Sequence, residues 1–199
     1  MTSSLAMPQP QPQTQAQQPK PKPAPRKLTL AEFRRKYSDR EDRYKYEFNN
    51  GIVEKSPSSM KVKQFHIVDN LTEGFRKTQA FQKGDRLATE IEQLTSAIQL
   101  RRPDLAYLPR EKIKSNDESI SEFAIEIISP TDNYIKVAGK PREYFRAGMK
   151  VLWQIIPEEQ SVYVYTSPTQ VTICEGSTIC SAAPAIPDFE IAAEDIFAK

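Results

Sequence analysis

The sequence predicts one α/β domain built on a mixed central β-sheet with flanking helices. Its most apolar strand pattern is FAIEII at 123–128, which is followed by a helical pattern and then by the strand pattern VLWQII at 151–156. This strand, helix, strand order favours a parallel pair, because parallel neighbours need a crossover connection. Hairpin patterns on both sides favour antiparallel neighbours, so the sheet is expected to be mixed.

The first 27 residues differ in composition from the rest of the chain. They are rich in Pro, Gln, Ala and Lys and include the run PKPKP at 19–23. Ordering this segment would cost backbone entropy, and it has almost no apolar side chain to offset that cost. We therefore expect a disordered Pro/Gln-rich tail at 1–27 and one domain at 28–199, which is long enough for a single core.

Charge is unevenly divided between these two parts. The whole chain carries +2, but the tail holds four basic residues and no acid, which leaves −2 for residues 28–199. The domain is therefore not a broadly basic nucleic-acid binder. A contact with DNA would have to come from local basic clusters, which are more often solvated faces: Arg34 to Lys36, Lys61 with Lys63, and Arg101 with Arg102.

Composition also restricts the class of protein. The sequence has no apolar run long enough to span a bilayer and no secretory leader pattern, so we expect a cytoplasmic protein without a membrane partner. Cys174 and Cys180 do not make a disulfide framework, and with one histidine they cannot form a closed four-ligand zinc site. We expect both cysteines to be small residues in or near strands.

Capping and turn signals predict the first elements. Thr29 and Glu32 have capping-box spacing and indicate a short opening helix. Asn50-Gly51 is a pair that a two-residue hairpin turn prefers, and it predicts strands at 44–48 and 52–55.

Apolar periodicity predicts the next elements. A helix is expected from about 60 to 79, where Val62, Phe65, Leu71 and Phe75 approximate one apolar stripe. Strand patterns follow at 86–92, 95–100 and 105–108. The segment RRPD at 101–104 interrupts the last two.

The last third of the chain contains a second helix and a closing hairpin. Residues 129–132, SPTD, are a strong helix-start signal, and the helix is expected to reach Arg146 before Gly148 closes it. The strand at 151–156 should then be followed by a closing antiparallel hairpin with strands at 161–165 and 170–174.

Glu126 occupies an unusual place for a carboxylate. Strand alternation puts Phe123, Ile125 and Ile127 on one face of FAIEII and Glu126 on the other. A carboxylate buried there must find a cation, a metal or hydrogen-bond donors, or take up a proton. Asp104 lies in a comparable place, just before a short apolar strand, so two neighbouring strands would bring both acids together.

Two carboxylates held close together repel each other unless a positive charge lies between them. Hard oxygen ligands on a rigid sheet suit Mg²⁺, which keeps several waters for chemistry. Spacing alone leaves a second interpretation open, in which Glu126 pairs with a core Arg or Lys and Asp104 caps a turn.

Several motifs in order resemble one known family, the Uma2 family. They are RRPDLAYLP at 101–109, AIEIISPTD at 124–132, K-x-x-E-Y at 140–144 and G-x-x-x-x-W at 148–153. The resemblance extends to Tyr46-Glu47 with Gly51, to His66, to Ile186 to Phe189 and to Ile196-Phe197, and covers about residues 29–199. Uma2 proteins are mainly bacterial, are especially numerous in cyanobacteria, and belong with the PD-(D/E)xK nuclease-like folds.

The resemblance implies a restriction-endonuclease-like fold and a metal-dependent endonuclease that hydrolyses phosphodiester bonds in DNA. Asp104 and Glu126 would bind Mg²⁺ or Mn²⁺, Lys140 would be their positive partner, and Glu47 would complete the acidic cluster. The implied partner is DNA, and by analogy with folds of this type a homodimer is also expected.

This sequence departs from the standard nuclease pattern at the lysine. The position two residues after the second acid is Ile128, so the lysine would come from the next helix as Lys140. Pro141 disfavours helical angles at the preceding residue and could redirect Lys140, in which case Lys136 is the substitute. His66 could shuttle a proton or could be an ordinary helix histidine, and Glu90 could approach the acidic cluster or face solvent.

Two further interpretations belong to other functional classes. In the first, the chain is a nuclease-like fold whose chemistry has weakened, leaving a nucleic-acid-binding or protein-interaction module. In the second, the tail is the functional part and the domain serves as a scaffold.

Overall fold

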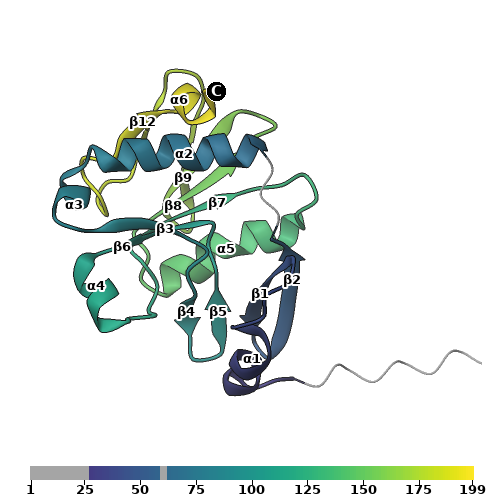
Figure 1. Ribbon diagram of the computed structural model, residues 1–199. Helices are drawn as coiled ribbons and strands as arrows, with labels where there is room; N and C mark the ends of the chain where they lie inside the picture. The colour runs from purple at the N-terminus through teal and green to yellow at the C-terminus, as the bar shows by residue number, and fades with distance from the viewer. Residues whose placement is uncertain (1–26, 59–61) are drawn as a thin grey trace, which may run out of the picture.

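A six-stranded mixed sheet forms the centre of the computed structural model, which describes residues 27–58 and 62–199 (Figure 1). Its order is β10-β9-β8-β7-β6-β3; β7 and β8 run parallel, and the other neighbours run antiparallel. This confirms the expected fold class. The strands are β3 (Arg86–Thr89), β6 (Leu105–Leu108), β7 (Phe123–Ile127), β8 (Val151–Ile156), β9 (Ser161–Ser167) and β10 (Gln170–Cys174). Apart from Lys27, the tail at 1–27 lies outside the described residues, and so does Lys61.

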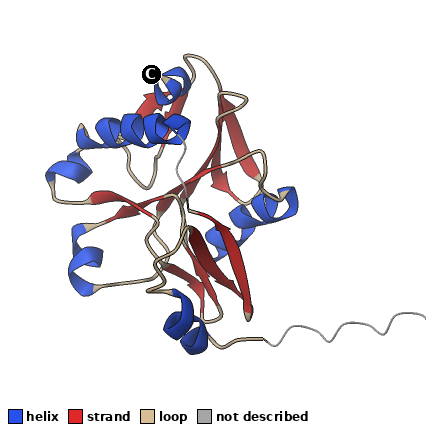
Figure 2. Cartoon of the chain, turned by 45° about the vertical axis from the view of Figure 1, so that its right-hand side comes forward, coloured by secondary structure: helices blue, strands red, loops and turns tan. Residues whose placement is uncertain are grey.

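A second, four-stranded antiparallel sheet lies beside the main sheet (Figure 2). Its order is β2 (Ile52–Pro57), β1 (Tyr44–Asn49), β5 (Gln99–Arg101) and β4 (Gln93–Ser96). The predicted Asn50-Gly51 turn joins β1 to β2, with φ of 51° and 88° at its two residues. Such positive φ values match the twist of a hairpin and explain why this pair is found there.

Two of the expected strands have different limits. The single strand expected at 95–100 is interrupted by a tight turn, in which the Ser96 hydroxyl accepts a hydrogen bond from the Ile98 amide. The strand expected at 86–92 ends at Thr89, because Glu90 adopts a positive φ of 52° that breaks the extended backbone. These two changes separate β3 in the main sheet from β4 and β5 in the small sheet.

Helices cover both faces of the main sheet. On one face lie α2 (Val62–Arg76) and α6 (Ala193–Phe197), and on the other lies α5 (Tyr134–Arg146) (Figure 1). The predicted alternation in β7 is confirmed, since Phe123, Ile125 and Ile127 belong to the core under α2, while Ala124 packs with Tyr144 of α5. Glu126 therefore faces the α5 side.

The apolar stripe expected on α2 is only partly correct. Leu71 and Phe75 are buried together with Ile67, but Val62 and Phe65 are exposed. An α-helix turns by about 100° per residue, so Val62 and Leu71 lie on opposite sides of the helix. The helix also ends at Arg76, and the short α3 (Gln79–Gln82) begins a new capped turn.

The remaining elements close the ends of the domain. The predicted capping box is present on α1 (Leu30–Tyr37), where the Glu32 amide donates to Thr29 Oγ1 at 3.2 Å and the Thr29 amide donates to Glu32 Oε2 at 2.9 Å. Cys174 and Cys180 are buried free thiols at strands, as expected. The other elements are α4 (Arg110–Ser115), β11 (Ile179–Ser181) and β12 (Glu190–Ala192).

No helix in residues 27–58 and 62–199 is long and apolar enough to cross a membrane.

The two kinds of α2 position give a stability test. Leu71→Ala removes a fully buried side chain from the main core, and we expect a loss of about 2–5 kcal/mol in the free energy of unfolding. Phe65→Ala on the same helix removes a side chain that is 54% exposed, so we expect a loss of about 0.5 kcal/mol or less. Urea denaturation of both variants measures the difference, and equal losses would contradict the assigned helix face.

Candidate active site

Asp104 stands immediately before β6, where the start of β6 lies beside the end of β7 within the main sheet. Leu105 pairs with Ile125 in antiparallel register, so Asp104 lies across from Glu126. Its Oδ2 accepts a 2.7 Å hydrogen bond from the Ile127 amide, and its Oδ1 lies 2.8 Å from the ammonium of Lys45. The juxtaposition expected from sequence is therefore present.

Glu126 is only 3% exposed, and both of its oxygens have partners. The Tyr144 hydroxyl donates to Oε1 at 2.5 Å, and Lys140 Nζ lies 2.8 Å from Oε2. Burial raises the pKa of the Glu126 carboxyl, the negative charges of Asp104 and Glu47 raise it further, and Lys140 opposes them. The result is a carboxyl whose pKa lies above its ordinary value.

Lys140 points into the site despite the proline that follows it. The helix α5 runs through Pro141 without a break, and Lys140 contacts Glu126. A proline inside a helix leaves the carbonyl four residues earlier without its donor. That carbonyl belongs to Val137, and it accepts a 3.0 Å hydrogen bond from the buried side chain of Gln154 on β8. Gln154 thus replaces the missing bond.

Lys136, the alternative lysine, lies elsewhere. Its ammonium is 3.3 Å from Glu54 Oε1 and its side chain is 57% exposed. Of the two lysines, Lys140 alone is close to the Asp104 and Glu126 pair.

Glu47 comes from β1 and joins the cluster from the small sheet. It is buried, its Oε1 accepts a 2.8 Å hydrogen bond from the Arg102 amide, and its Oε2 lies 3.6 Å from the Arg101 guanidinium. Burial alone would raise the pKa of Glu47, but Lys140 and Arg101 outweigh burial and hold that pKa below its ordinary value. Glu47 is therefore held as a carboxylate.

Lys45 is a member of the site that the sequence did not identify. It lies two residues before Glu47 on β1, and the same alternation that directs Glu47 inward directs Lys45 inward. Burial would lower the pKa of its ammonium, but the Asp104 and Glu126 carboxylates raise it overall. The sequence signal that could have identified Lys45 was the alternation of charged residues with Tyr44, Tyr46 and Phe48.

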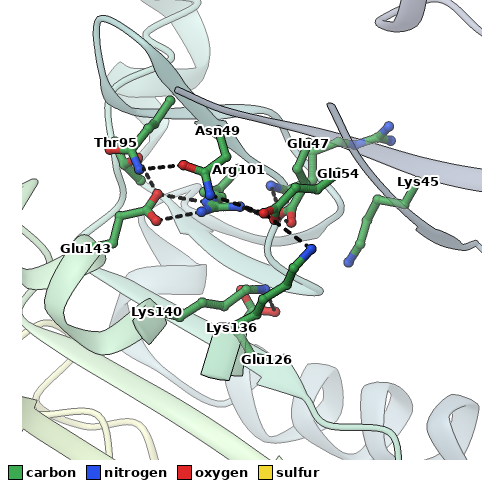
Figure 3. A network of polar contacts seen from close by, with 12 residues as sticks. Lys45, Glu47, Asn49, Glu54, Thr95, Arg101, Glu126, Lys136, Lys140 and Glu143 are labelled. Carbon is green, nitrogen blue, oxygen red and sulfur yellow. Dashed lines mark hydrogen bonds and ion pairs between the residues drawn. The ribbon is translucent and has the colours of Figure 1, made fainter. Parts of the chain in front are cut away.

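Arg101 is the centre of the polar network in Figure 3. Its side chain is 5% exposed, and it donates to Glu143 on α5 at 2.6 and 2.7 Å and to Glu54 on β2 at 2.8 Å. Thr95 donates to the same Glu143 at 2.6 Å. One guanidinium thus connects the small sheet to the helix that carries Lys140, and it is not available as the DNA contact considered from sequence.

Of the other residues considered from sequence, Glu90 approaches this cluster, because its amide donates a 3.3 Å hydrogen bond to the Asp104 carbonyl. His66 is on α2, which covers the opposite face of the main sheet from α5 (Figure 1). Glu90 Oε2 lies 3.5 Å from the guanidinium of Arg102. Arg34 pairs with Glu118, and Lys63 lies 3.4 Å from Glu158.

The acidic residues of the site supply two carboxylates that could hold a metal ion. Within the part of the chain that the structure describes, no three acidic, histidine or cysteine side chains are grouped so that they could hold an ion. Asp104 and Glu126 still offer a fitting donor set, because Mg²⁺ is commonly held by one or two carboxylates, with waters and substrate phosphates in the other positions. Carboxylate oxygens also keep lone pairs beyond those that accept the observed hydrogen bonds.

Comparison with known proteins decides the family. A family model described as "Uma2: Putative restriction endonuclease" matches residues 30–194. The chain belongs to the Uma2 family.

The fold of this Uma2 protein also matches a solved structure. It is similar to a crystal structure described as "a putative nuclease belonging to DUF820" from Anabaena variabilis, with a TM-score of 0.71 and 21% sequence identity. The match covers 85% of this chain and 97% of that chain. At this identity the similarity shows the restriction-endonuclease-like fold, which confirms the fold expected from sequence. A search of curated proteins gave no match.

The Arg101 network predicts a large difference between neighbouring arginines. Arg101→Met would leave the carboxylates of Glu143, Glu54 and Glu47 without their buried cation, and we expect a loss of about 3–5 kcal/mol in the free energy of unfolding. Arg102→Met removes a more exposed cation that lies 3.5 Å from Glu90, and about 1 kcal/mol or less should be lost. If chemical denaturation gives similar values for both, Arg101 does not hold the two sheets and α5 together.

Proposed function

We propose that this Uma2 protein is a metal-dependent endonuclease that hydrolyses phosphodiester bonds in DNA. One observation carries the proposal: Asp104 and Glu126 face each other where the start of β6 lies beside the end of β7, with Lys45 and Lys140 in ion pairs with them. Family membership supports a nuclease, since the family carries the description "Putative restriction endonuclease".

Asp104 and Glu126 are the residues that would hold Mg²⁺ or Mn²⁺. A bound divalent ion would supply Lewis acidity toward a phosphate oxygen and would lower the pKa of a bound water. Glu47, which is kept ionised by Lys140 and Arg101, adds negative charge beside this position.

The two lysines supply positive charge for the reaction. Hydrolysis forms a bond from a water oxygen to phosphorus and breaks the bond from phosphorus to a sugar oxygen, and negative charge builds up on the phosphoryl oxygens on the way. Preorganised cations stabilise such developing charge. Lys140 fits this role because Glu126 fixes its ammonium at 2.8 Å. The Tyr144 hydroxyl fixes the same carboxylate from the other oxygen.

A second candidate function rests on a different observation. All four oxygens of Asp104 and Glu126 already have protein donors, from Lys45, Ile127, Lys140 and Tyr144. A site satisfied in this way would be stable without a metal, as in a nuclease-like fold that retains only binding.

The cytoplasmic location and the homodimer expected from sequence stay predictions.

Metal binding and cleavage separate the two candidates. We expect wild-type protein to bind Mn²⁺ by titration calorimetry and to nick supercoiled plasmid, and Asp104→Asn to lose both because it removes a carboxylate ligand. Lys140→Met should lose about 100-fold or more in cleavage rate, since one preorganised charge donor is removed. It also leaves the buried Glu126 carboxyl without its cation and so lowers stability, and the rates are therefore compared at a temperature at which circular dichroism shows both proteins folded.

Lys136→Met is the matched control, because it removes an exposed lysine of the same helix that pairs with Glu54 outside the acidic pair. Its cleavage rate should stay within about threefold of wild type, as for other exposed substitutions. Folded wild-type protein that neither binds Mn²⁺ nor nicks DNA would instead favour the binding module.

A further inference from the structure

The outer stripe of α5 is a surface that the proposed active site does not use. It consists of the residues that lie within about a third of a turn of one another on the side of the helix away from Lys140 and Tyr144: Ile135, Ala138, Gly139, Arg142 and Arg146. All five are exposed, and Ile135 keeps 80% of its surface. Apart from the neighbouring residues and backbone of α5 itself, no atom of the described residues lies within 4 Å of the position that a Cβ on Gly139 would occupy. No part of the described chain therefore covers the middle of the stripe.

Two arginines of this stripe, Arg142 and Arg146, form no ion pair with any residue in the described part of the chain. No carboxylate lies within ion-pair distance of Arg142 or Arg146 among the described residues, whereas Arg34, Arg101 and Arg102 each have one. The two side chains line an open hollow of about 420 Å³ together with Phe145 and Pro168. The domain as a whole carries −2, so a pair of uncompensated arginines favours an anion from outside the protein.

The stripe lies close enough to the site for one ligand to reach both. Arg142 and Arg146 are about one turn apart, and Lys140 lies on the other side of the helix, about half a turn before Arg142 and less than two turns before Arg146. A helix with its side chains is about 10–12 Å across. A strand that passes the Lys140 side of α5 can therefore continue over the arginines, which suit phosphate groups because guanidinium binds them in a bidentate fashion.

We propose that the outer stripe of α5 is a nucleic-acid contact surface, on which Arg142 and Arg146 bind backbone phosphates of the strand outside the active site. This inference rests on the proposed function for the identity of the polyanion. Phe145 and Pro168 form the apolar walls of the hollow between the arginines and the β9 to β10 turn. The contact carries no sequence information, because it addresses phosphates.

The test compares DNA binding by the full chain in EDTA, so that cleavage plays no part. The probes are a short fluorescein-labelled single strand and the corresponding duplex, followed by fluorescence anisotropy over a range of salt concentrations. For Arg142→Ala/Arg146→Ala we expect about a tenfold or larger loss of affinity, and a salt dependence that is less steep by about 1.4 to 1.8 in log–log slope.

The matched control is Lys77→Ala/Lys83→Ala, which removes two exposed cations near α3. It should bind as wild type does. An equal loss of DNA affinity in both double variants would mean that only the net charge of the protein matters, and it would overturn the proposal. So would an arginine variant with a lower Tm and unchanged DNA affinity, since that result assigns the arginines to the C-terminal dipole of α5.

Failure of this proposal can be told apart from failure of the proposed function. If the arginine variant binds and nicks DNA as wild type does in Mn²⁺, the endonuclease stands and the contact surface is overturned. If wild type binds DNA through the arginines and never cleaves it, the contact surface stands and the endonuclease fails. A folded wild type that binds neither probe overturns the contact surface.

Discussion

The carboxylate of Glu126 lies in β7, a strand in which every residue is buried, and the surrounding structure compensates its charge. An unpaired carboxylate there would cost several kcal/mol. Lys140 and Tyr144 both reach it, and because they are four residues apart on α5 they require one face of that helix to lie against β7. Asp104 then needs its own cation, which β1 supplies as Lys45.

Arg101 connects the helix that lies against Glu126 to the small sheet. Through Glu143 it fixes the helix that carries Lys140, and through Glu54 and Glu47 it fixes the hairpin that carries Lys45. The small sheet therefore supplies side chains to the site in addition to packing beside the main sheet. Gln154 makes the arrangement compatible with a proline beside Lys140, because it caps the carbonyl that the proline leaves without a donor.

Local patterns in the sequence predicted most of the fold and the acidic pair. Strand alternation is a two-residue period, so the face of Glu126 could be assigned from its neighbours, and the family motifs supported Lys140. Lys45 and Gln154 were missed because their roles depend on which strands become neighbours, and strand order is a long-range property. The α2 stripe and the limits of β3 to β5 failed for a related reason: exposed apolar residues and one positive φ at Glu90 carry no strong local signal.

The central claim is that the Asp104 and Glu126 carboxylates form a metal site served by Lys140. Anomalous scattering from crystals of the wild-type protein soaked in Mn²⁺ tests it most directly. The account predicts one anomalous peak bonded to oxygens of both carboxylates, with the Lys45 contact to Asp104 lengthened or lost. Crystals without a peak there, in which both carboxylates keep their lysines at the present distances, would contradict it.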